Sequence, residues 1–81
     1  MTLDAAREAL SRAGNRLGNA TRAVWSAQAV YDEAERTGDD FDIIHASLAL
    51  TTAAKDQARL QAAYDAAEAD LVRAAIEDGE I

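Results

Sequence analysis

Apolar residues recur along the first half of the chain at the seven-residue spacing that is typical of packed helices. One set consists of large residues and the other, three positions further on, of alanines: Leu3, Leu10, Leu17, Val24 and Tyr31, and Ala6, Ala13, Ala20, Ala27 and Ala34. Ala9, Ala23 and Val30 widen this apolar stripe on one side. The heptad pattern predicts a helix over residues 3–36 that packs through a seam lined by alanine.

The second half of the chain repeats the pattern less strictly and predicts a second helix over residues 41–77. Its two heptad sets are Ile43, Leu50, Gln57, Tyr64 and Leu71, and Ala46, Ala53, Leu60, Ala67 and Ala74. Gln57 is the only polar residue among these ten. It either fixes the register of the seam, as a buried amide can, or lies at a solvated edge, which is the interpretation we favour.

A turn over residues 37–40 separates the two predicted helices. Gly38 suits the position just past a helix end, because glycine adopts the left-handed conformation at little cost. Asp39 or Asp40 can cap the second helix, and Thr2 can cap the first. So short a turn requires the helices to run antiparallel, and the predicted fold is therefore all-α, a two-helix antiparallel coiled-coil hairpin.

The composition of the chain indicates that one hairpin does not bury enough apolar area on its own. Residues 1–81 are expected to form a single helical-hairpin domain, near the lower size at which one core suffices. Apolar residues make up 49% of the chain, but most are alanines, which bury little surface. We therefore expect a homo-oligomer, in which two hairpins dimerise into a four-helix bundle.

Gly14 and Gly18 lie inside the first predicted helix, where a glycine costs about 1 kcal/mol relative to alanine. Because the heptads continue through both positions, we expect the helix to continue as well. Ser11, Thr21, Trp25 and Gln28 lie on the same side of the helix, at spacings of three or four residues from one another or from the glycines. These six residues predict a shallow groove that ends in a tryptophan and is shaped for another helix. The alternative is a local kink that nothing contacts.

Large apolar residues also lie outside the seam of the second predicted helix, close to the turn. These are Phe41, Ile44 and Leu48. In an antiparallel hairpin they lie toward the same end as Trp25, and clustered exposed apolar residues usually mark an interface. We expect all four to contribute to a partner interface, which requires that they form one patch. Alternatively, they fold back over the flank of the hairpin.

The chain is acidic, with 15 acidic and 8 basic residues and a net charge of −7. Because polyanion binding needs clustered Lys and Arg, this charge disfavours direct nucleic-acid binding and favours a protein partner with a basic surface. Six acidic residues crowd the turn: Asp32, Glu33, Glu35, Asp39, Asp40 and Asp42. They either form a solvated surface that aids solubility or steer the chain electrostatically toward a basic target.

No set of side chains suggests catalysis, a cofactor or a metal ion. His45 is the only histidine, and the chain has no cysteine. Asp39, Asp40 and Asp42 lack the glycine and the distal glutamate of a calcium loop. We therefore expect no catalytic, cofactor-binding or metal-binding residues, and we expect that the protein is not an enzyme.

Three functions fit these features. The leading one is a non-catalytic protein–protein interaction module, an adaptor or assembly component that acts through helix–helix packing. The alternative is a small acidic inhibitor of phage type, anti-CRISPR-like, that blocks the basic nucleic-acid-binding site of a bacterial defence enzyme. In length, heptads and short turn, the architecture also resembles the Rop family of plasmid regulators, whose hairpins dimerise into four-helix bundles. That resemblance implies an RNA-binding regulator as the third function.

The sequence also gives expectations about source and location. Abundant alanine and a preference for arginine over lysine indicate the GC-rich genome of a bacterium or a phage. No apolar run approaches the roughly 20 residues of a membrane span, and the N-terminus lacks the apolar stretch of a signal peptide. We therefore expect a cytoplasmic protein with no membrane partner.

Overall fold

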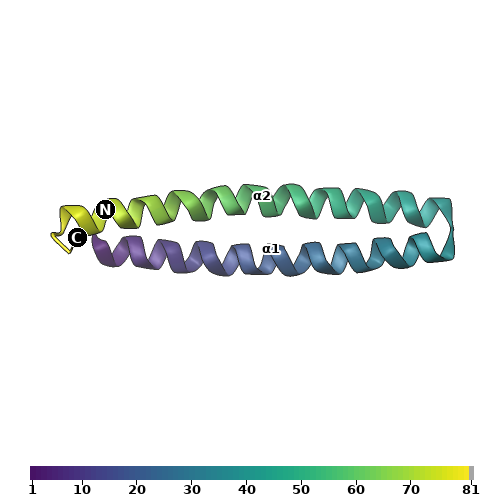
Figure 1. Cartoon of the computed structure of the whole chain (residues 1–81), viewed down its shortest axis with the longest axis horizontal. Coiled ribbons are helices and arrows are strands. Elements are labelled where there is room, and N and C mark those ends of the chain that lie inside the picture. The colour runs from purple at the N-terminus through teal and green to yellow at the C-terminus, as the bar shows by residue number, and fades with distance from the viewer. Residues whose placement is uncertain (81) are drawn as a thin grey trace.

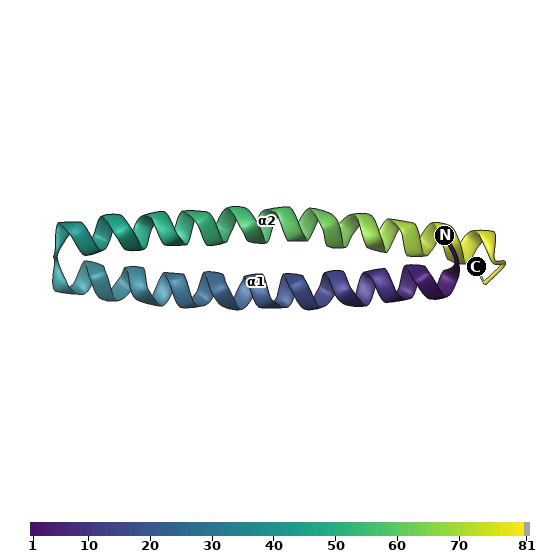
Figure 2. The same cartoon turned by 180° about the vertical axis from the view of Figure 1, so that it is seen from behind.

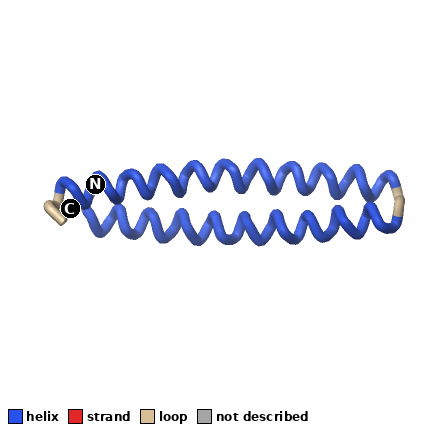
Figure 3. Tube along the Cα trace, in the orientation of Figure 1, coloured by secondary structure: helices blue, strands red, loops and turns tan. Residues whose placement is uncertain are grey.

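Two long antiparallel α-helices make up the structure, a computed structural model that describes residues 1–80. Helix α1 spans Leu3–Thr37 and helix α2 spans Asp40–Glu77, and the described residues include no strand (Figures 1 and 3). The rod measures 59 × 15 × 13 Å, with both chain ends at the end opposite the turn. The predicted all-α hairpin is thus confirmed. Helix α1 ends one residue later, and α2 begins one residue earlier, than the pattern indicated.

The turn and the helix starts have the capping residues that the sequence suggested. The Thr2 hydroxyl accepts a hydrogen bond from the Ala5 amide at 3.1 Å, and the Asp39 carboxylate accepts one from the Asp42 amide at 3.1 Å. Gly38 is left-handed, with φ 77°, and its amide donates to the Ala34 carbonyl at 3.0 Å. Side-chain caps of this kind satisfy amides that have no partner inside the helix.

Replacing Gly38 with alanine is expected to lower the free energy of unfolding by about 1 kcal/mol, because alanine is strained at positive φ. Gly79 offers a control, since it has φ 81° and also follows a helix end, but no second helix follows it within residues 1–80, so strain there can be relieved by fraying of the last turn. The Gly79→Ala variant is expected to unfold like the parent protein. Urea denaturation followed by circular dichroism measures both changes, and equal effects at the two positions would contradict the role given to Gly38.

The two helices lie side by side along the rod (Figure 2), and the residues of the heptad sets form an apolar seam between them. All twenty residues of the heptad sets are buried or partly buried. The five apolar residues that are buried are all alanines: Ala6, Ala20, Ala34, Ala46 and Ala74. No large side chain of residues 1–80 is fully buried. Alanine lets the two backbones approach closely, but the core that results holds little apolar area.

Of the three residues that widen the apolar stripe on one side, only Ala9 is partly covered by the second helix. Ala9 is partly buried, but Ala23 is exposed and Val30 is 59% exposed. These residues lie one position before the seam residues Leu10, Val24 and Tyr31, on the flank of the hairpin. A pair of helices covers only the narrow strip where they touch, so the flank stays open to solvent.

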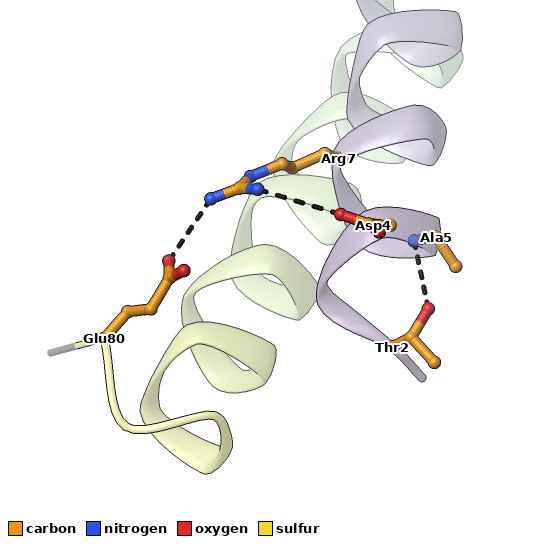
Figure 4. A network of polar contacts seen from close by, with 5 residues as sticks. All are labelled: Thr2, Asp4, Ala5, Arg7 and Glu80. Atoms are coloured by element: carbon orange, nitrogen blue, oxygen red, sulfur yellow. Dashed lines mark hydrogen bonds and ion pairs between the residues drawn. The ribbon is translucent and has the colours of Figure 1, made fainter.

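Ion pairs contribute little to holding the helices together. Within residues 1–80, only the pair between Arg7 and Glu80, at 3.2 Å, joins the beginning of the chain to its end. Figure 4 shows the Arg7 guanidinium between this carboxylate and that of Asp4, which is 3.8 Å away. The other ion pairs join residues three or four apart in one helix. Exposed pairs of this kind contribute about 0–1 kcal/mol each, so the seam carries the fold.

Candidate interaction surface

A groove of about 570 Å³ lies beside the seam near the middle of the rod. Residues of both helices line it: Gly14, Leu17, Gly18, Thr21, Arg22 and Trp25 from α1, and Gln61 and Tyr64 from α2. Four of these are among the six residues expected to form a groove, and Ser11 and Gln28 do not line it. The structure therefore brings Gly14, Gly18, Thr21 and Trp25 together, and adds a wall from α2 that sequence reasoning missed.

Helix α1 is continuous through Gly14 and Gly18. A Cβ atom built at Gly14 lies 3.5 Å from Cε2 of Tyr64, which is ordinary van der Waals contact. A Cβ atom built at Gly18 has no other atom within 4 Å. The packing of the hairpin therefore requires neither glycine, although each weakens the helix that contains it.

Replacing Gly14 or Gly18 with alanine is accordingly expected to raise the free energy of unfolding of the hairpin by about 1 kcal/mol. Thermal and urea denaturation should be measured at the lowest protein concentration that circular dichroism allows, so that association does not contribute. Ala29, an exposed residue of the same helix, provides the reverse control: Ala29→Gly should lose a similar amount. A destabilised Gly18→Ala variant would show that the hairpin itself needs this glycine.

Thr21 links the groove to the interior of the hairpin. The Gln57 side-chain amide of α2 donates a hydrogen bond to the Thr21 hydroxyl at 3.1 Å, and the contact is partly buried. This bond joins the two helices while Gln57 stays only partly buried, so the geometry is compatible with both interpretations of Gln57, a register-fixing amide and a residue at a solvated edge. The bond itself was not predicted, because Thr21 lies outside both heptad sets.

The four large apolar residues expected in one patch lie on two different sides of the rod. Trp25, which is 68% exposed, and Ile44, which is 59% exposed, each follow a seam residue by one position and lie on the side of the groove. Phe41 and Leu48 lie on the outer side of α2. The Phe41 ring contacts the His45 ring, with centroids 4.3 Å apart, and Leu48 lines a separate depression formed by α2 alone.

The acidic residues around the turn are all exposed. Asp39 caps α2, and Asp40 and Asp42 lie in its first turn, where negative charge is favourable. Gln28 of the predicted interface donates a hydrogen bond to Asp32 at 2.9 Å, one helical turn further along α1. Glu33 is paired with Arg36. Several of these carboxylates thus have a local role at a helix end or within one helix.

The described part of the chain contains no cluster of three or more His, Cys, Asp or Glu side chains placed to hold a metal ion. Neither helix has a stretch long and apolar enough to cross a lipid bilayer. His45 contacts Phe41 and lies beside Asp42 and Ala49 in a shallow depression at the turn end. The surface features that the hairpin offers for function are thus its grooves, its exposed apolar residues and its acidic turn.

Comparison with known proteins gives no match: no family model, no curated protein and no solved structure is significantly similar to the chain. The fold defines a class, the antiparallel helical hairpin, and function has to be argued from the surface of the hairpin.

Proposed function

We propose that the chain is a non-catalytic protein–protein interaction module that acts through helix–helix packing. In this proposal the hairpin is a two-helix coiled coil, and two copies combine into a four-helix bundle. The observation that carries it is the exposure of large apolar side chains: eight are between 48% and 73% exposed in residues 1–80. Three of them, Trp25, Ile44 and Val72, lie on the same side of the hairpin as the groove, and exposed apolar residues on one surface usually mark an interface.

The surface area of the hairpin supports the same proposal. A compact monomer of 8.6 kDa exposes about 4,700 Å² of surface, whereas the hairpin exposes 5619 Å². The excess, about 900 Å², is similar to the roughly 800 Å² that each partner contributes to a standard protein–protein interface. One partner of the size of the hairpin itself would therefore restore the usual ratio of surface to mass.

A second candidate function is the acidic inhibitor, which would occupy the basic nucleic-acid-binding site of a defence enzyme. The observation that favours it is the set of exposed carboxylates at the turn: Asp32, Glu35, Asp40 and Asp42 have no cation within ion-pair distance among residues 1–80. Such uncompensated charge attracts a basic surface over a distance set by the ionic strength. An RNA-binding role finds less support, since Arg7, Arg12 and Arg36 are each paired with carboxylates.

Sedimentation equilibrium over a wide range of protein concentration tests the leading proposal. The expected result is a monomer–dimer equilibrium whose dissociation constant changes little between low and high salt, because apolar packing is weakly screened. A mass of one chain at every concentration, with unfolding that does not depend on concentration, would contradict self-association. An interaction that weakens steeply with salt would instead favour the acidic surface.

A further inference from the structure

We propose that the groove side of the hairpin is the surface through which two copies associate, around a two-fold axis beside Thr21, so that Trp25 of each copy packs against Gly18 of the other. This inference rests on the proposed function and adds the face and the register. We call this side the groove face. It consists of the positions that follow, by one residue or by four, each member of the heptad set that begins at Leu3 on α1 and of the set that begins at Ile43 on α2.

The positions that define the groove face are uncharged over the middle of the rod. The one charged residue that lines the groove, Arg22, lies beside them on α1 and donates a hydrogen bond to Asn19. Between residues 11 and 28 of α1, and between residues 44 and 61 of α2, none of the groove-face positions is Asp, Glu, Lys or Arg. The opposite side of the hairpin has four charged residues over the same spans: Arg12, Arg16, Asp56 and Arg59. Interface cores are depleted of charge and enriched in tryptophan, and the groove face has both properties.

Trp25 and Gly18 form a projection and a recess on this face. They occupy the same heptad position one repeat apart, about 10 Å along the helix. The Trp25 side chain is 68% exposed, and the space above Gly18 is open. In a two-fold interface, if one residue contacts another in the second copy, the reverse contact also forms. When two α1 helices pack antiparallel about a centre near Thr21, Trp25 of each copy therefore lies over Gly18 of the other, and the contact forms twice.

The same register gives compatible neighbours along the rest of α1. Each groove-face residue is paired with the one at an equal distance on the other side of the centre. The pairs that follow are Gly14 with Gln28, Ser11 with Asp32, and Arg7 with Glu35. A small residue thus lies opposite a long amide, a hydroxyl opposite a carboxylate, and a cation opposite an anion. The positively charged start of α1 lies against its acidic end.

Helix α2 is compatible with an axis at the same point. Its groove-face residues are self-complementary about Ala58: Ile44 lies opposite Val72 and Thr51 opposite Asp65. Ala58 follows Gln57, the residue that is hydrogen-bonded to Thr21. The two centres, near Thr21 on α1 and at Ala58 on α2, are therefore side by side in the hairpin, as one two-fold axis across both helices requires. The exposed area in excess of a compact monomer, about 900 Å², is sufficient for one such interface.

Exchanging the projection and the recess tests the register. Trp25→Ala and Gly18→Trp are each expected to raise the dissociation constant of the dimer about 30-fold or more, as loss of a central tryptophan contact does. The double variant Gly18→Trp/Trp25→Gly keeps the composition and restores the pairing, so its dissociation constant should return to within about 10-fold of that of the parent. Phe41→Ala is the matched control, since Phe41 is also 68% exposed but lies off the groove face.

Cysteine cross-linking provides a readout without changing the tryptophan. The chain has no cysteine, so Ala58→Cys introduces one thiol at the proposed axis and Ala62→Cys introduces one on the outer side of α2. A short bis-maleimide is expected to link Ala58→Cys into covalent dimers rapidly and Ala62→Cys slowly.

The outcomes separate the inference from the proposal on which it rests. A parent protein that is monomeric at all concentrations overturns both. Three other results overturn the face and the register while leaving self-association in place. The first is a dimer that survives Trp25→Ala but is lost in Phe41→Ala. The others are rapid cross-linking through Ala62→Cys and a double variant whose dissociation constant does not return toward that of the parent.

Discussion

Replacing Ala20 with aspartate is expected to unfold the hairpin, or to lower its free energy of unfolding by about 3 kcal/mol or more. Ala20 is 6% exposed at the middle of the seam, where the backbones of α1 and α2 approach closely. An aspartate there would be buried without a cation, and the close packing has no room for its carboxylate. A domain of this length has a total stability of about 4–12 kcal/mol, so the loss is a large part of the whole.

Ala29→Asp is the control for this variant, because Ala29 lies on the exposed side of the same helix. Its effect should stay within about 0.5 kcal/mol, as is usual for surface substitutions. Far-UV circular dichroism gives the helix content of both variants, and thermal denaturation gives their relative stability. Similar losses at the two positions would mean that the alanine seam is not the core of the fold.

The second large effect is expected for Tyr64→Ala, which should destabilise the hairpin by about 2 kcal/mol. Tyr64 belongs to the seam of α2, and its ring forms the wall of the groove opposite Gly14. The side chain is partly buried, so the loss stays below the roughly 3–5 kcal/mol of a fully buried aromatic residue. Urea denaturation at low protein concentration measures it.

Two further variants make this prediction specific. Tyr64→Phe keeps the ring and should unfold within about 0.5 kcal/mol of the parent protein. Trp25→Ala removes a larger side chain, but one that is 68% exposed, and it should affect association more than the stability of the single hairpin. If Trp25→Ala destabilised the isolated hairpin more than Tyr64→Ala, the assignment of Tyr64 to the core and Trp25 to the surface would be wrong.

The fold was predictable because its determinants are local and repeated. The heptad positions run from Leu10 through Leu17 to Val24 without interruption, which outweighs the poor helix propensity of the two glycines between them. The ends of the helices follow from single side chains at Thr2, Gly38 and Asp39, whose capping roles do not depend on the rest of the molecule.

The groove was predictable only in part, for the same reason. Its α1 residues share one helix, so their spacing alone places them together. Its α2 residues, Gln61 and Tyr64, depend on which residue of α2 lies beside Gly14, and this register depends on the length of the turn. The hydrogen bond between Gln57 and Thr21 joins the helices in that register. A sequence read one helix at a time does not contain this relation.

The single apolar patch was not predictable from proximity to the turn. Trp25 and Leu48 lie toward the same end of the rod but differ in direction around their helices, and direction decides which surface a side chain joins. Ile44 shares the side of Trp25, whereas Phe41 does not. A heptad count applied to the flanking positions, and not only to the seam, separates the two groups.

The most direct test of the account is the fluorescence of Trp25, the only tryptophan, followed over a dilution series together with the mass of the protein in solution. This side chain is exposed in the single hairpin, and in the proposed dimer it packs against a second copy. The emission maximum is therefore expected to move to longer wavelength on dilution, with the same midpoint as the change from dimer mass to monomer mass. An emission maximum that stays constant while the mass halves would show that the hairpins meet through another face.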